Sequence, residues 1–113
     1  VGVLGLTFKE DVPDTRNSRV PDIIRELQEY GIEPLVDDAH ASAEDIARWG
    51  MTMTPLAEWN ALDAIVFAVP HREYLAQSMS QLLACMRDGG VVFDVKSRLN
   101  PNDIPSEMTY LAL

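Results

Sequence analysis

The sequence has 113 residues, of which 47% are hydrophobic, and this suits one globular domain with a single core. Nine Lys and Arg residues stand against 18 Asp and Glu residues, and the net charge of −9 argues against nonspecific binding to nucleic acids or anionic membranes. No apolar run approaches the roughly 20 residues of a membrane-spanning helix, and no basic leader precedes the first apolar run, so we expect a cytoplasmic protein.

Strand-like and helix-like segments alternate along the chain. Residues 1–8 form a short apolar run that predicts a buried strand, and because the chain opens inside this run we expect a segment of a longer protein. A helix with one apolar face follows, with Asn17 or Ser18 as its cap and Gly31 at its end. The apolar face of this helix consists of Val20, Ile23, Ile24, Leu27 and Tyr30.

The pattern continues to the end of the chain. Further strands are predicted over residues 33–38, 51–55 (a weak signal), 61–70, 90–97 and 108–113. Helical segments are predicted over residues 42–50, 55–60 and 71–90. Because helices alternate with strands that are nearly continuous apolar runs, the sequence predicts an α/β fold with a doubly wound parallel sheet in three layers. We expect one Rossmann-like domain over residues 1–113, with strand order 3-2-1-4-5-6.

The basic residues are unevenly distributed. Five of the nine fall in two short windows, which are Lys9, Arg16 and Arg19 after the first predicted strand, and Lys96 and Arg98 after the fifth. Ligands of doubly wound sheets bind beyond the carboxyl ends of the strands, near the point where the strand order reverses. Both windows are therefore expected along one edge of the sheet, where they could bind an anionic ligand. The alternative is ordinary scattered surface charge.

The first loop lacks the glycine pattern of dinucleotide-binding folds. The G-x-G-x-x-G motif lets the backbone approach a pyrophosphate, but Gly2 and Gly5 both lie within the first predicted strand. Side chains can bind a diphosphate instead: Lys9 as a point charge and Arg16 through its planar fork, with Phe8 stacking on a flat base. The alternative for Arg16 is a structural salt bridge with a neighbouring aspartate.

Other polar residues carry weaker signals. Asp37 and Asp38 end the second predicted strand, where a ribose-binding acid would sit, but they follow the first strand at a longer spacing than usual, which favours a solvated turn. His40 and His71 are unsupported as metal ligands, and His71 at the head of a predicted helix favours a capping or packing role over catalysis. Cys85 stands alone, which excludes an internal disulfide, and its apolar surroundings predict a small core residue.

Three segments together resemble a known family. Residues 5–38, GLTFKEDVPDTRNSRVPDIIRELQEYGIEPLVDD, resemble the opening of the C-terminal domain of UDP-glucose/GDP-mannose dehydrogenases, with its pattern G-x-x-F-K and then D-x-R-x-S. The matching residues are Gly5, Phe8, Lys9, Asp14, Arg16 and Ser18. LDAIVFAVPHREYL and VVFDVKSRL resemble later strands of the same domain, so the resemblance spans essentially the whole chain. The sequence departs from the family at Asp37–Asp38–Ala39, where Tyr-Asp-Pro is common.

The resemblance implies an NAD-dependent nucleotide-sugar dehydrogenase, most like the bacterial branch that oxidises UDP-N-acetylhexosamines for surface polysaccharides. It also implies a homo-oligomeric enzyme in which another domain binds most of the NAD. The catalytic cysteine would belong to another segment too, so Cys85 is not that cysteine and this chain is inert alone. The residues that the resemblance assigns to the UDP-sugar are Phe8, Lys9 and a basic residue of the turn after the fifth predicted strand, for which Lys96 and Arg98 are the two alternatives. Arg16 would approach NAD. The alternative is a regulatory or interaction module of the same fold without a ligand.

Overall fold

The computed structural model describes residues 1–5, 20–48, 50–51, 53–69, 71–77 and 79–112. The strands are β1 (Gly2–Leu4), β2 (Leu35–Asp37), β3 (Leu62–Phe67), β4 (Met86–Asp94) and β5 (Thr109–Ala112). The helices are α1 (Val20–Glu29), α2 (Ala43–Arg48), α3 (Arg72–Leu75) and α4 (Met79–Leu82), with short 3-10 turns η1 (Leu56–Glu58) and η2 (Pro101–Asp103). Within these ranges, no helix is long and apolar enough to cross a membrane.

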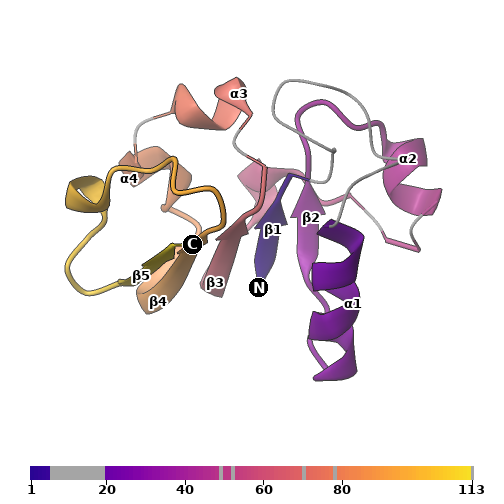
Figure 1. The fold of residues 1–113 in the computed structure, drawn as a ribbon, viewed down its shortest axis with the longest axis horizontal. Helices are drawn as coiled ribbons and strands as arrows, with labels where there is room; N and C mark the ends of the chain where they lie inside the picture. The colour runs from indigo at the N-terminus through magenta and orange to yellow at the C-terminus, as the bar shows by residue number, and fades with distance from the viewer. Residues whose placement is uncertain (6–19, 49, 52, 70, 78, 113) are drawn as a thin grey trace.

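All five strands run parallel in one sheet, in the order β2-β1-β3-β4-β5 (Figure 1). The chain goes outward from β1 to β2 and then returns past β1 to β3, so the strand order reverses between β1 and β3. This confirms the predicted doubly wound α/β fold. The weak third predicted strand contributes only an isolated parallel bridge between Met53 and Val36 in the described part of the chain.

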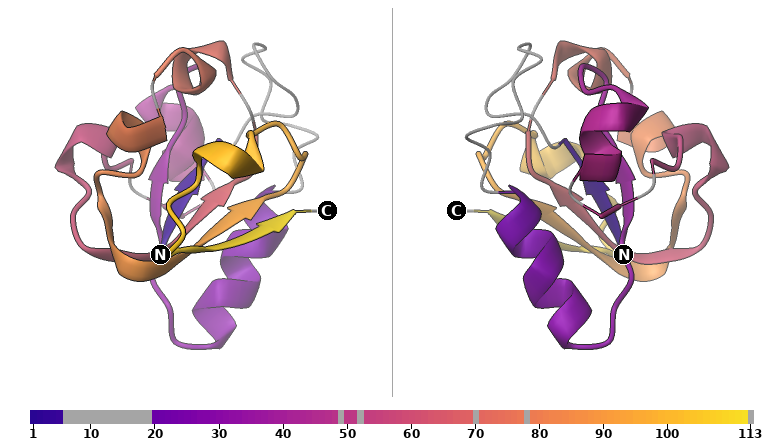
Figure 2. Two further views of the ribbon diagram at one scale, coloured as in Figure 1. Left: turned by 90° about the vertical axis from the view of Figure 1, so that its left-hand side faces the viewer. Right: turned by 90° about the vertical axis from the view of Figure 1, so that its right-hand side faces the viewer.

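Helical segments cover both faces of the sheet. Figure 2 shows α1 on one side of the strands and η1 with α4 on the other. Consecutive residues of a strand point to opposite faces, and the neighbours Val3 and Leu4 accordingly join different apolar clusters. Val3 packs with Val20 and Ile24 of α1, whereas Leu4 belongs to the cluster that contains Phe67. The domain therefore has the three predicted layers.

Helix α1 ends in a glycine-dependent turn. Gly31 has a φ of 79°, its N–H donates to the Gln28 carbonyl at 3.0 Å, and the Ile32 N–H donates to the Leu27 carbonyl at 3.0 Å. This is the Schellman arrangement that a glycine favours, and it confirms the predicted helix end. The prediction that Tyr30 belongs to the apolar face was wrong: Tyr30 lies beyond the helix, in the turn, and is 81% exposed.

Two of the shorter predicted helical segments are confirmed. In α2 the Ser42 hydroxyl oxygen accepts a hydrogen bond from the Asp45 N–H at 3.1 Å, which is the predicted N-terminal cap. Ile46 of α2 is fully buried against the α1 side of the sheet. The helical segment predicted over residues 55–60 forms the 3-10 turn η1.

The predicted helix over residues 71–90 was wrong in its second half. The segment forms the short helices α3 and α4, and β4 begins at Met86, which pairs with Leu62 of β3. The Cys85 carbonyl accepts a hydrogen bond from the Leu62 N–H at 2.8 Å, so the backbone here already follows the sheet. A short apolar run such as LLACM fits a buried strand as well as a helix, and its pairing with β3 decides between them.

Gly5 allows the end of β1 to lie close to the residues that follow β3. It directly follows β1 rather than lying inside it, and its φ of 98° suits glycine. A Cβ at this position would lie 2.5 Å from the Val69 Cβ, and the Leu4 carbonyl accepts hydrogen bonds from the N–H groups of Ala68 (2.9 Å) and Val69 (3.2 Å). The space beside Gly5 is therefore filled by protein.

Candidate functional site

The candidate site lies at the carboxyl edge of the sheet. Figure 1 shows α3 beyond the ends of the central strands, at this same edge. The basic turn, residues 95–98, directly follows β4, and its Lys96 and Arg98 are exposed. These two predicted site residues therefore sit where the topology rule placed them. The other predicted site residues, Phe8, Lys9 and Arg16, lie outside the described residues.

A buried carboxylate holds the basic turn. Asp94 at the end of β4 is fully buried, and its Oδ1 accepts a hydrogen bond from the Arg98 N–H at 3.1 Å. Its Oδ2 accepts one from the Leu99 N–H at 2.8 Å. Ser97, which directly precedes Arg98, has a φ of 54°, a backbone conformation that non-glycine residues seldom adopt. Asp94 thus stabilises a tight turn that presents the two cations to solvent.

The edge strand β5 supplies a third donor to the same carboxylate. The Tyr110 hydroxyl donates to Asp94 Oδ2 at 2.7 Å. Burial, together with this hydrogen bond to the carboxylate, raises the pKa of Tyr110 to about 12, so its hydroxyl remains a donor at neutral pH. Asp94 therefore has three protein donors and bridges the basic turn to β5.

A cavity of about 230 Å³ opens beside Arg98. Its lining combines α3 and α4 with the segment after β4, and consists of Tyr74, Leu75, Gln77, Met79, Leu82, Arg98, Leu99, Asn100 and Asp103. Lys96 is not among the lining residues. The cavity gives Arg98 a recess in which a bound group could be partly desolvated, a setting that strengthens a charge-assisted hydrogen bond.

A second buried carboxylate ties β2 to α3. Asp38 is only 1% exposed, and its Oδ1 accepts hydrogen bonds from the N–H groups of His40 (2.7 Å) and Ala41 (2.8 Å). Its Oδ2 lies 3.0 Å from Nε2 of the fully buried His71. The solvated-turn interpretation of Asp38 was therefore wrong, because the β3–α3 connection covers the end of β2. The packing role of His71 is confirmed.

A further pair lies beside this one. His40 Nε2 lies 3.0 Å from Glu73 Oε2, and the rings of His40 and His71 have centroids 4.5 Å apart. The Glu73 backbone amide, followed by the hydrogen bond with His40, lowers the pKa of Glu73. Two histidine–carboxylate pairs thus join the same two segments, and this arrangement indicates a structural junction. Among the described residues, no group of three or more His, Cys, Asp or Glu side chains could hold a metal ion.

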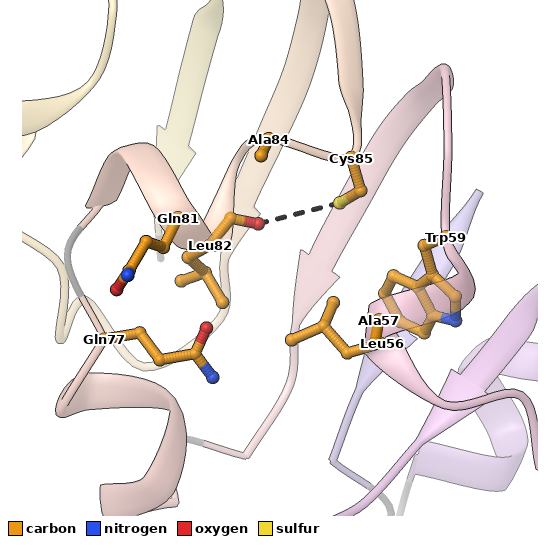
Figure 3. Close-up of a pocket in the computed structure, with 8 residues that line it drawn as sticks. All are labelled: Leu56, Ala57, Trp59, Gln77, Gln81, Leu82, Ala84 and Cys85. Atoms are coloured by element: carbon orange, nitrogen blue, oxygen red, sulfur yellow. Dashed lines mark hydrogen bonds between the residues drawn. The ribbon is translucent and has the colours of Figure 1, made fainter.

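Cys85 borders a separate cavity of about 320 Å³ (Figure 3). In Figure 3, Gln77 and Gln81 face Leu56 and Trp59 across this space. Cys85 is only 6% exposed, and its thiol lies 3.6 Å from the Leu82 carbonyl oxygen. The predicted core role of Cys85 is confirmed.

We expect the Cys85 thiol to react slowly with a thiol reagent while the chain is folded. Burial raises the pKa of Cys85, and the thiolate is the reactive form. The measurement is the rate of modification by an aromatic disulfide reagent at neutral pH, with and without denaturant. Equal rates in the two conditions would contradict the buried placement.

Sequence reasoning missed Asp94 and assigned Asp38 to a solvated turn, although both carboxylates organise this edge. Asp94 stands at the end of a strong apolar strand, in VVFDVKS, and Asp38 ends the run LVDD. An acid that closes an apolar strand in a doubly wound sheet is a usable signal, because the crossover connection covers the strand end and an ionised group there needs hydrogen-bond donors. Tyr110 carried no such signal.

Comparison with known proteins defines the family. Residues 2–101 match the model of the UDP-glucose/GDP-mannose dehydrogenase family, UDP binding domain. Because this match covers most of the chain, the protein belongs to that family and represents its UDP binding domain. The family is one of dehydrogenases, whose chemistry uses a nicotinamide cofactor.

Curated relatives agree with this assignment. The chain is 38% identical over 105 residues to Protein CapL of Staphylococcus aureus, covering 92% of this chain and 24% of the relative. It is 38% identical over 99 residues to UDP-N-acetyl-D-glucosamine 6-dehydrogenase of Pseudomonas aeruginosa, covering 87% of this chain and 24% of the relative. The chain therefore spans about a quarter of the length of the relatives that it matches.

Solved structures share the fold. A UDP-D-ManNAc dehydrogenase from Pyrococcus horikoshii superposes with a TM-score of 0.75 at 21% identity, covering 98% of this chain and 24% of that one. The UDP-N-acetyl-mannosamine dehydrogenase Cap5O from S. aureus gives a TM-score of 0.71 at 22% identity, covering 98% of this chain and 25% of that one. At these identities the likeness supports the Rossmann-like fold alone.

Proposed function

We propose that this chain is the C-terminal nucleotide-sugar-binding domain of an NAD-dependent UDP-sugar 6-dehydrogenase. The complete enzyme would oxidise UDP-N-acetylglucosamine, its galactosamine isomer or UDP-glucose to the uronic acid for surface polysaccharide synthesis in the cytoplasm. The supporting observation is the basic turn that Asp94 holds at the carboxyl edge of a UDP binding domain, with a cavity beside Arg98. The curated relatives named as UDP-N-acetyl-D-glucosamine 6-dehydrogenases favour the N-acetylhexosamine substrates.

In this proposal the basic turn binds the diphosphate. Arg98 is the principal contact, because its backbone N–H is held by a buried carboxylate and its side chain borders the cavity. Lys96 adds a nearby positive charge. Phe8 and Lys9 complete the nucleotide site from the first loop. Binding energy gathered on the nucleotide would position the distant C6 hydroxyl for hydride transfer.

NAD would be bound mainly by another domain of the same polypeptide. The sequence after β1 lacks the G-x-G-x-x-G motif with which dinucleotide-binding folds approach a pyrophosphate. Arg16 would approach the cofactor across the domain boundary. The catalytic cysteine would also come from another segment, and the complete enzyme would be a homo-oligomer.

An NMR titration of the isotopically labelled chain tests the nucleotide site. We expect UDP to shift the amide signals of Phe8, Lys9 and residues 96–98, because these residues would surround the diphosphate. NAD should shift them less. Uridine, which lacks phosphates, is the matched control ligand and should leave residues 96–98 nearly unchanged.

Two results would count against the proposal. Stronger shifts from NAD than from UDP at these residues would show that the ligand was misassigned. Absence of shifts with either ligand would favour an interaction module over a half-site for a nucleotide sugar.

A further inference from the structure

The basic turn is connected to the edge strand β5 through one carboxylate. Tyr110 donates its hydroxyl to Asp94 Oδ2 at 2.7 Å, and this same oxygen accepts the Leu99 N–H at 2.8 Å. The other oxygen, Oδ1, accepts the Arg98 N–H at 3.1 Å. Asp94 thus links Tyr110, which lies 16 residues away in the sequence, to the backbone of Arg98 and Leu99.

The sheet itself fixes the position of Tyr110. Tyr110 pairs in register with Val92 of β4, and its ring packs partly buried against the core cluster that contains Val92 and Leu99. Asp94 is two residues beyond Val92 on the same face of β4, so the tyrosine hydroxyl reaches it diagonally along the sheet. The rigid ring of Tyr110, on a strand paired with β4, therefore supports the Asp94 carboxylate.

The orientation of the Asp94 carboxylate plane decides whether its two oxygens can accept from both backbone amides. Rotation about the terminal bond of an aspartate is broad and nearly two-fold, so the bond itself selects no single orientation. The hydroxyl of Tyr110 adds a second, charge-assisted donor to Oδ2 and leaves Oδ1 for Arg98. Without that hydroxyl, the carboxylate can tilt and the turn can relax.

We propose that Tyr110 is a positioning residue for nucleotide-sugar binding, which acts through Asp94 to hold the turn that presents Lys96 and Arg98 to the diphosphate. This inference rests on the proposed function of the basic turn. Tyr110 would act through Asp94 rather than through the substrate, because its hydroxyl donates to the Asp94 carboxylate. The raised pKa of Tyr110 supports the role, because the hydroxyl stays protonated and donating over the working pH range.

The test uses the complete dehydrogenase polypeptide with Tyr110→Phe, which removes one hydroxyl and keeps the ring. We expect the dissociation constant for UDP, measured by calorimetry, and the KM for UDP-N-acetylglucosamine to rise about 3- to 10-fold, the range for one lost hydrogen bond. The kcat should change little. Tyr30→Phe is the matched control, because Tyr30 is 81% exposed and remote from the turn, and it should leave both constants unchanged.

A double-mutant cycle separates positioning from general loosening of the fold. If Tyr110 acts through the turn, Tyr110→Phe should weaken UDP binding much less in an Arg98→Ala background than in the wild type. Additive effects would overturn the positioning role. Unchanged UDP binding by Tyr110→Phe, with a clear loss in Arg98→Ala, would overturn this inference and leave the proposed function intact. Unchanged binding in both single variants would overturn the assignment of the basic turn itself.

Discussion

Replacing Asp38 with alanine is expected to lower the free energy of unfolding by about 3–5 kcal/mol, because three hydrogen-bond partners lose their contact with the carboxylate at about 1–3 kcal/mol for each buried group. The Asp38 carboxylate accepts hydrogen bonds from the N–H groups of His40 and Ala41 and lies 3.0 Å from Nε2 of His71. All three partners would lose their bond to the carboxylate. Water can hardly replace these bonds, because Asp38 and His71 are 1% and 0% exposed. The measurement is urea denaturation of the 113-residue chain followed by circular dichroism.

Two variants control this result. Asp38→Asn keeps one carbonyl oxygen for the backbone amides but removes the charge beside His71, so it should lose clearly less stability than the alanine variant. Asp22→Ala should change stability by no more than about 0.5 kcal/mol, since Asp22 pairs with Arg25 on an exposed helix surface. A loss in Asp38→Ala no larger than that in Asp22→Ala would contradict the buried junction between β2 and α3.

Replacing Asp94 with alanine should affect both stability and binding. The change leaves the Leu99 N–H, the Arg98 N–H and the Tyr110 hydroxyl without their acceptor. Each buried group left without a hydrogen-bond partner costs about 1–3 kcal/mol, and a half-exposed group costs less. We therefore expect the free energy of unfolding to fall by about 3–5 kcal/mol in total. Urea denaturation of the same chain gives this value.

The binding consequence distinguishes Asp94 from an ordinary core residue. With the turn released, UDP binding by the complete dehydrogenase should weaken about 10-fold or more, as expected when a charge-assisted contact is lost. Asp88→Ala is the matched control, because Asp88 lies on the same strand but is exposed. Retention of normal UDP affinity in a folded Asp94→Ala protein would show that the turn binds no nucleotide.

Much of the fold was predictable because it follows from local patterns. The strands β1, β2 and β3 follow from apolar runs in the sequence. The turn at Gly31 follows from the backbone conformation that glycine favours. The position of Lys96 and Arg98 at the carboxyl edge followed from topology, since parallel strands place all their carboxyl ends together.

The errors arose where contacts distant in sequence decide the outcome. The helix predicted through residue 90 ends early because Cys85 and Met86 pair with Leu62, a partner that no local period reveals. Tyr30 fits the helical spacing of an apolar face, but the helix ends before it and its side chain is 81% exposed. Among the described residues, the weak third strand contributes the isolated bridge of Met53 with Val36.

The sequence by itself determined the fold class, the family resemblance and the edge at which the basic residues of the last turn lie, because these depend on residue order and local pattern. Only the tertiary structure decided that Asp38 and Asp94 are buried and that the Tyr110 hydroxyl donates to Asp94. Burial of a charge depends on which distant segments cover a strand end, and the hydrogen bond of Tyr110 depends on the register of β5 against β4. Both are properties of the packed sheet, in which residues far apart in the chain become neighbours.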